Sequence, residues 1–98
     1  MRYCATMKYV LLYEASKDFM AKVPHQIAAH RALWHKFHSE GSLMMVGPFN
    51  DPPAGGAMGI FTTREAAEAF VAADPFVASG IVARHSIREW NEVLQPAK

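Results

Sequence analysis

Hydrophobic and polar residues recur along the chain with two different periods, which predict strands and helices. Residues Met7–Glu14 alternate, with apolar side chains on both sides, as is typical of a strand covered on both faces. Residues Pro24–Gly41 repeat at about 100° per residue, which predicts a helix with a proline in its first turn and a glycine at its end. The polar segment Ala15–Val23 connects the two, although the helix could already begin near Phe19.

The second half of the chain predicts three more strands and another helix. Ser42–Pro48 and Ala57–Thr62 predict an antiparallel pair around the loop Phe49–Gly56, which is rich in proline, glycine, asparagine and aspartate. A helical spacing follows and ends at Asp74-Pro75, because the residue before a proline avoids the α conformation. Ile81–Trp90 predicts the last strand.

The element order is β-α-β-β-α-β, the split βαβ arrangement. It predicts an α+β fold in which two helices cover one face of a four-stranded antiparallel sheet. The first three strands nevertheless carry apolar residues on both faces. These residues include Tyr9, Tyr13, Met58 and either Met44 or Met45. Because a monomer rarely leaves such a patch in water, we predict a homodimer formed through the sheet faces.

Composition limits the chain to one globular domain and a few classes of partner. Its 98 residues can build a single core, and 51% of them are hydrophobic. We expect a domain at 7–94, a short leader at 1–6 and a tail at 95–98. Ten basic and nine acidic residues are spread along the chain, which argues against the clustered basic face of a nucleic-acid-binding protein.

The single cysteine, Cys4, excludes a disulfide within the chain and a thiolate metal cluster. The first residues lack the apolar core of a signal peptide, and no apolar run approaches the ~20 residues that span a bilayer. We therefore expect a cytoplasmic protein with no membrane partner.

One ionisable ring lies among apolar residues on the first predicted helix. At helical spacing, His30 falls in the middle of an apolar stripe. The stripe consists of Ile27, Leu33, Trp34 and Phe37. A core-facing helix side has little use for a group that can change its charge near neutral pH, so His30 is the first candidate for chemistry.

The other histidines of this helix raise the question of a metal site. His25, His30, His35 and His38 are spaced by five, five and three residues, which does not place three ligands on one face. His35 and His38 could form a two-ligand pair, but a solvated helix flank is the more common outcome. We predict no metal site.

Several motifs in a fixed order resemble the YciI-like (YCII-related) family. They are the helical histidine, His38-Ser39-Glu40-Gly41, Gly47-Pro48, Asp74-Pro75-Phe76 and Gly80. The resemblance extends from about Met7 to Trp90. It implies a ferredoxin-like dimeric αβ barrel whose active site is built on a histidine and an aspartate.

Carried over by position, the resemblance assigns these two roles to His30 and Asp74. The segment Ile27-Ala28-Ala29 departs from the commoner pattern, which has an arginine or a proline, so an anion-binding role there would fall to Arg31 or Lys22. Some members of the family resemble lyases that eliminate chloride from hydroxylated aromatics. The resemblance thus implies which residues form the site, and it implies less about the substrate.

A carboxylate that accepts a hydrogen bond from one imidazole nitrogen leaves the other nitrogen free to move a proton. His30 and Asp74 could form such a dyad. The structural alternative makes His30 a core residue bonded to a carbonyl oxygen, and Asp74 the N-cap of a turn that begins at Pro75. Capping and catalysis are compatible for Asp74.

Aromatic residues could line a pocket for a flat apolar ligand, although such residues more often belong to the core. Tyr13 and Phe37 are candidates for the lining. The predicted substrate-binding residues are Tyr9, Arg31, Trp34 and Phe76. We expect no cofactor, but related dimeric αβ barrels include haem proteins and cofactor-free monooxygenases.

These observations favour a homodimeric enzyme of lyase or isomerase type that acts on a small cyclic or aromatic metabolite by proton transfer at His30. Two other functions fit the same residues. One is a domain that binds a small molecule without converting it, and the other is a protein-interaction domain.

Overall fold

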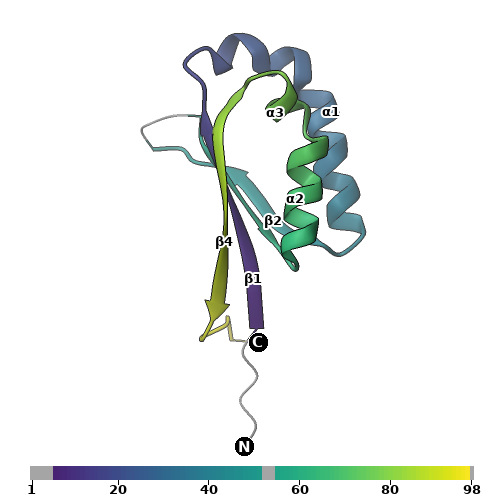
Figure 1. Cartoon of the computed structure of the whole chain (residues 1–98), viewed down its shortest axis with the longest axis vertical. Coiled ribbons are helices and arrows are strands. Elements are labelled where there is room, and N and C mark those ends of the chain that lie inside the picture. Colours follow the sequence, from purple (N-terminus) through teal and green to yellow (C-terminus); the bar gives the residue numbers. More distant parts are fainter. Residues whose placement is uncertain (1–5, 52–54, 98) are drawn as a thin grey trace, which may run out of the picture.

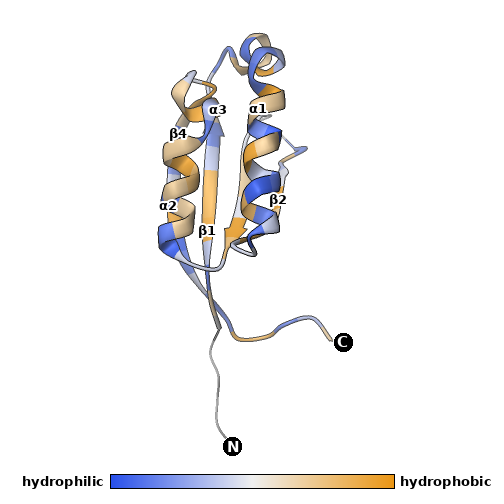
Figure 2. Ribbon diagram, turned by 90° about the vertical axis from the view of Figure 1, so that its right-hand side faces the viewer, coloured by the Kyte–Doolittle hydropathy of each residue, from blue (hydrophilic) through white to orange (hydrophobic). Residues whose placement is uncertain are grey.

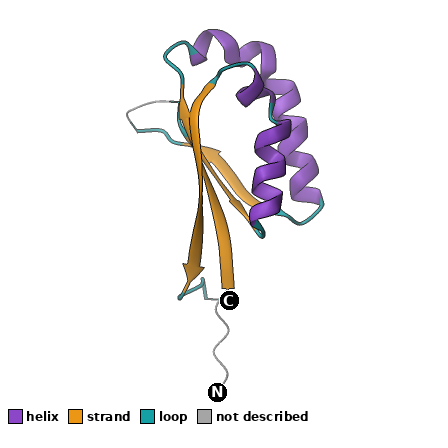
Figure 3. Ribbon diagram, viewed as in Figure 1, coloured by secondary structure: helices purple, strands orange, loops and turns teal. Residues whose placement is uncertain are grey.

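Four antiparallel strands form one sheet in the order β2-β3-β1-β4. The computed structural model describes residues 6–51 and 55–97. Its elements are β1 (Thr6–Ala15), α1 (Phe19–Ser39), β2 (Leu43–Pro48), β3 (Ala57–Phe61), α2 (Arg64–Ala73), α3 (Pro75–Ala78) and β4 (Val82–Glu92). All the helices lie on the same side of the sheet (Figure 1, Figure 3). The predicted element order and layer arrangement are therefore confirmed, with one short helix added.

The core lies between the sheet and the two long helices, which stand side by side with β1 visible between them (Figure 2). Helix α1 contacts β2, and α2 contacts β1, β3 and β4. The buried cluster consists of Leu11, Tyr13, Phe37, Leu43, Phe61, Ala67 and Phe70. Phe61 and Phe70 are fully enclosed, with ring centroids 5.3 Å apart, and Phe37 meets Phe70 edge to face. Burying each large apolar side chain contributes roughly 1.5–3 kcal/mol to folding, so these rings hold α1 and α2 on the sheet.

The first helix begins at Phe19, one and a half turns before Pro24. The alternative start near Phe19 is therefore confirmed, and a start at Pro24 is wrong. A proline inside a helix removes one backbone hydrogen bond. In the turn before Pro24, Phe19 and Val23 line a cavity beside the sheet, and Lys22 pairs with Asp18 at 3.4 Å.

The first or last residues of several strands differ from the prediction by one or two positions. Strand β1 already includes Thr6, and β4 continues to Glu92, where it pairs with Thr6. Residues 1–5 of the predicted leader lie outside the described residues, and Cys4 is among them. So do residues 52–54 of the predicted loop and residue 98 of the predicted tail.

Each strand points one set of side chains toward the helices and the alternate set toward the opposite side of the sheet, which we call the open face. Leu11 and Tyr13 face the helices, so alternation along β1 places Val10 and Leu12 on the open face. The strand register adds Ile60, Met58, Met45 and Trp90 to this face. Of the apolar strand residues that the sequence analysis names, Tyr9 and Tyr13 pack on the helix side, and Met45 and Met58 lie on the open face.

Candidate functional site

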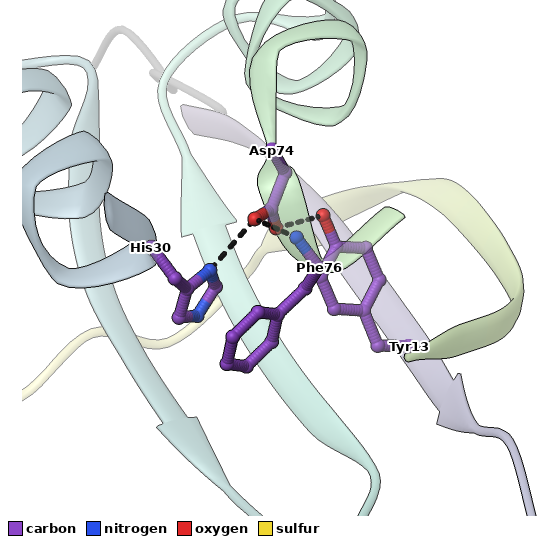
Figure 4. A network of polar contacts seen from close by, with 4 residues as sticks. All are labelled: Tyr13, His30, Asp74 and Phe76. Carbon is purple, nitrogen blue, oxygen red and sulfur yellow. Dashed lines mark hydrogen bonds and ion pairs between the residues drawn. The ribbon is translucent and has the colours of Figure 1, made fainter. Parts of the chain in front are cut away.

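Two of the predicted site residues meet between α1 and the start of α3. Nδ1 of His30 lies 2.7 Å from Oδ1 of Asp74 (Figure 4). The Asp74 side chain is fully buried, whereas the His30 side chain keeps 13% of its surface exposed. The sequence placed these residues 44 positions apart, and the fold brings them into direct contact.

Asp74 is held by donors on both of its carboxylate oxygens. The Tyr13 hydroxyl donates to Oδ2 at 2.6 Å, and the Phe76 backbone N–H donates to Oδ1 at 3.0 Å. The second bond makes Asp74 the N-cap of α3, whose first residue is Pro75. The predicted cap is thus present together with the contact to His30. Since a carboxylate is an acceptor only, an ionised Asp74 can satisfy both of these donors and an imidazole N–H as well.

The Tyr13 hydroxyl keeps its proton throughout the neutral range. Burial raises the pKa of Tyr13 well above its usual value, and the hydrogen bond to Asp74 raises it further. Sequence reasoning proposed Tyr13 as a pocket residue but missed its bond to Asp74. The available signal was the alternation of β1, which puts Tyr13 on the same inner side as Leu11.

The same contacts fix the tautomer of His30. Because Nδ1 faces a carboxylate, it carries the proton in the neutral ring, and Nε2 is left as the acceptor. Among the described residues, Nε2 has no hydrogen-bond partner. The Phe76 ring stacks on the imidazole with centroids 3.7 Å apart and planes 7° from parallel. Stacking on Phe76 therefore holds the plane of the His30 ring, and the contact with Asp74 decides which nitrogen points toward the carboxylate.

His30 lines a cavity of about 470 Å³ between α1 and the ends of the strands. This volume falls within the roughly 300–1,000 Å³ typical of small-molecule sites. The first half of α1 forms one side, and the end of β2 and the start of β3 form another. Apolar side chains and glycine or proline backbone make up most of the lining. The described lining residues with polar atoms in their side chains are Tyr13, His30, Arg31 and Trp34.

The predicted substrate-binding residues separate into two groups. Arg31, Trp34 and Phe76 line the cavity together with His30. Tyr9 does not: its hydroxyl donates to Glu89 at 3.3 Å, and the Arg64 guanidinium lies over its ring. Phe37, the other aromatic residue considered for the lining, belongs to the buried core.

The remaining histidines of α1 do not gather around this cavity. His25, His35 and His38 are exposed, and the ring of His35 lies against Trp34. Within residues 6–51 and 55–97, no three histidine, cysteine, aspartate or glutamate side chains come close enough to hold a metal ion. In the same ranges, no helix has the length and apolar character needed to cross a membrane.

The raised pKa of Tyr13 predicts how stability depends on alkaline pH. The folded state keeps this proton, whereas a tyrosine in the unfolded chain loses it near pH ~10. The unfolded state then binds fewer protons, so stability falls as the pH rises above this value. Between pH ~8 and ~11, the wild-type protein should lose about 1 kcal/mol more unfolding free energy than Tyr13→Phe, measured by urea unfolding.

Tyr9→Phe is the comparison for this experiment, because the hydroxyl contact of Tyr9 is exposed to solvent. Removing it should change the alkaline slope less than removing the Tyr13 hydroxyl. Parallel slopes for the wild type and Tyr13→Phe would contradict a buried hydroxyl bonded to Asp74.

Comparison with known proteins places the chain in a family. A model of the YCII-related domain matches residues 7–91. The chain is 34% identical over 98 residues to protein YciI of Escherichia coli O6:H1, and this match covers 90% of the chain and 100% of that protein. Protein YciI of Shigella flexneri matches with the same identity and coverage.

Two solved structures share the fold. One is the 5-chloro-2-hydroxyhydroquinone dehydrochlorinase TftG of Burkholderia phenoliruptrix, in complex with 2,5-dihydroxybenzoquinone. It matches with a TM-score of 0.70 and 18% identity over 85% of this chain and 92% of that chain. The other, a protein of unknown function from Nitrosomonas europaea, has a TM-score of 0.56 and 12% identity over 96% of this chain and 95% of that chain.

At these identities the two structures establish the fold alone, and it is the predicted ferredoxin-like α+β fold. The family follows from the sequence matches, which extend over nearly the whole described domain and agree with the resemblance found in its motifs. The chain belongs to the YCII-related family.

Proposed function

We propose that the protein is a small-molecule enzyme of lyase or isomerase type, in which His30 transfers a proton without a metal or cofactor. The observation that carries this proposal is the contact between His30 and the buried Asp74 on the wall of a cavity large enough for a ring-sized ligand. General acid–base catalysis of this kind contributes about 10²–10⁴-fold, which suits a substrate that is already activated.

The proposed step begins with Nε2 of His30, the ring nitrogen that faces away from Asp74. Nε2 takes a proton from the ligand, and the electron pair left behind forms a double bond. In an elimination, a leaving group departs with its bonding electrons, and in an isomerisation the proton returns to another atom. Asp74 stabilises the imidazolium that forms between these events.

The proposed substrate is a small cyclic or aromatic compound with a polar group. A flat ligand fits a cavity bounded by Trp34 and by Phe76, which also stacks on His30. The similarity to TftG supports this class, because TftG is a dehydrochlorinase and was solved with 2,5-dihydroxybenzoquinone.

Replacing His30 tests the proposal. We would measure turnover of a panel of chlorinated and hydroxylated quinols, including 5-chloro-2-hydroxyhydroquinone. His30→Gln should lower kcat by about 10²-fold or more, because glutamine cannot carry the proton. His38→Gln is the matched control, since His38 is an exposed residue of the same helix and should leave kcat unchanged.

Equal turnover by His30→Gln and the wild type would reject the role of His30. Wild-type protein that binds members of the panel and converts none of them would favour the alternative function, a domain that binds a small molecule without catalysis.

We also propose that two copies of the chain associate through the open face of the sheet. Met45, Met58 and Trp90 lie on this face and are 61%, 36% and 45% exposed. Burying such side chains stabilises association. Sedimentation should therefore give twice the mass of one chain, and Met58→Asp should shift the protein toward the monomer. A monomeric wild type at micromolar concentration would contradict the proposal.

A further inference from the structure

The cavity leaves few polar groups free for a ligand. Among the described residues, the lining has polar side-chain atoms at Tyr13, His30, Arg31 and Trp34, whose indole N–H can donate a hydrogen bond. Both the Tyr13 hydroxyl and Nδ1 of His30 are bonded to Asp74. Asp74 itself is fully buried behind these donors and does not line the cavity. Apart from the indole N–H of Trp34, the polar side-chain groups that the described lining leaves for a ligand are therefore Nε2 of His30 and the guanidinium of Arg31.

These two groups have opposite requirements. Asp74 fixes the proton of the neutral imidazole on Nδ1, so Nε2 can only accept a hydrogen bond. The guanidinium of Arg31 can only donate, and it always carries a positive charge. No carboxylate among the described residues forms an ion pair with Arg31. A complementary ligand presents an acidic hydrogen to His30 and a negatively charged acceptor to Arg31.

The charge at Arg31 is better matched by a carboxylate than by a phosphate. The planar fork of a guanidinium pairs with the two oxygens of a carboxylate, and the single positive charge balances its single negative charge. Arg31 is exposed and also lines the cavity, so a phosphate dianion paired with it would bring a second negative charge next to a mostly apolar lining. Trp34 and Phe76, which line the same cavity, favour a flat apolar body.

We infer that the site binds planar, hydroxylated aromatic or enolic carboxylates, with the carboxylate at Arg31 and the hydroxyl at Nε2 of His30. This inference rests on the proposed function only for the proton transfer that follows binding. In that transfer the hydroxyl proton moves to Nε2, and the oxygen keeps the electron pair of the broken O–H bond. The negative charge of Asp74 then balances the imidazolium.

Binding of simple probes tests the inference without any turnover. The probes are 3- and 4-hydroxybenzoate, and the isomer that binds more tightly is compared with its amide and with its methoxy analogue. Dissociation constants come from NMR titrations of ¹⁵N-labelled protein. The amide lacks the charge and the methoxy compound lacks the acidic hydrogen, so each should bind about five- to tenfold more weakly.

Single-residue variants show which side chain causes the weaker binding of the amide and of the methoxy analogue. In Arg31→Gln, the hydroxybenzoate and its amide should bind equally. In Lys36→Gln, which removes an exposed positive charge from the same helix, the carboxylate should keep its advantage. In His30→Gln, the preference for hydroxyl over methoxy should disappear while the preference for the carboxylate remains.

The inference is overturned if neither hydroxybenzoate binds, if the amide binds the wild type as well as the carboxylate, or if Arg31→Gln keeps the preference. Its failure can be told apart from a failure of the proposed function. Loss of turnover in His30→Gln together with equal binding of carboxylate and amide would reject the inference alone. Both binding preferences together with full turnover by His30→Gln would reject the proposed function alone.

Discussion

Asp74→Asn is expected to lower kcat by about 10²-fold or more while the chain keeps its fold. Asparagine has nearly the shape of aspartate, and its side-chain oxygen can still accept from the Phe76 N–H and from His30. It lacks the negative charge that stabilises an imidazolium, and its amide group would face the Tyr13 hydroxyl. The measurement is kcat on the substrate used for His30→Gln, with circular dichroism as the check on folding.

The double variant decides whether the two residues act together. If Asp74 acts through His30, His30→Gln/Asp74→Asn should be no slower than His30→Gln alone, because residues that form one unit show non-additive losses. If the fold-losses in kcat of the two single variants multiply in the double variant, the two residues act independently, and the coupling is contradicted. Asp18→Asn is the control, since Asp18 is an exposed acid at the start of α1 and should leave kcat unchanged.

Phe70→Ala is expected to lower the free energy of unfolding by about 3–5 kcal/mol, a large part of the stability of a small domain. Phe70 is 1% exposed, and its ring contacts Phe37 and Phe61 with centroids 5.3 Å away in each case. Its ring also meets His30 edge to face, with centroids 6.3 Å apart. Urea unfolding measures the effect.

Phe49→Ala provides the comparison for this change. Phe49 is 41% exposed at the end of β2, so the same truncation should cost less than about 1 kcal/mol there. Similar losses at the two positions would contradict the central place of Phe70 between α2, α1 and the sheet.

Much of the fold could be predicted because periodicity follows directly from which side of an element is buried. The alternation around Leu11 indicated a strand, and the helical spacing from Ile27 to Phe37 indicated a helix and its inner side. The start of α1 was harder to predict, because Pro24 is a strong local signal for a first turn. The helix begins five residues earlier, at Phe19, and Phe19 and Val23 line the cavity together with residues that are distant in sequence.

The site was predicted in part, for the same reason. The inward position of His30 follows from the spacing of α1, and the link to Asp74 came from the family resemblance. The bond from Tyr13 to Asp74 joins residues 61 positions apart, and no local pattern specifies it. The position of Tyr9 beside Glu89 and Arg64, away from the cavity, likewise depends on strand pairing that a single sequence does not show.

The protonation of the His30 ring tests the central claim most directly. Long-range ¹H–¹⁵N correlation spectra report which nitrogen of a neutral imidazole carries the proton. The account predicts a proton on Nδ1 and a bare Nε2 in the wild type, because Asp74 accepts from Nδ1 at 2.7 Å. A neutral His30 with its proton on Nε2 would contradict the account, since that nitrogen could then not act as the base.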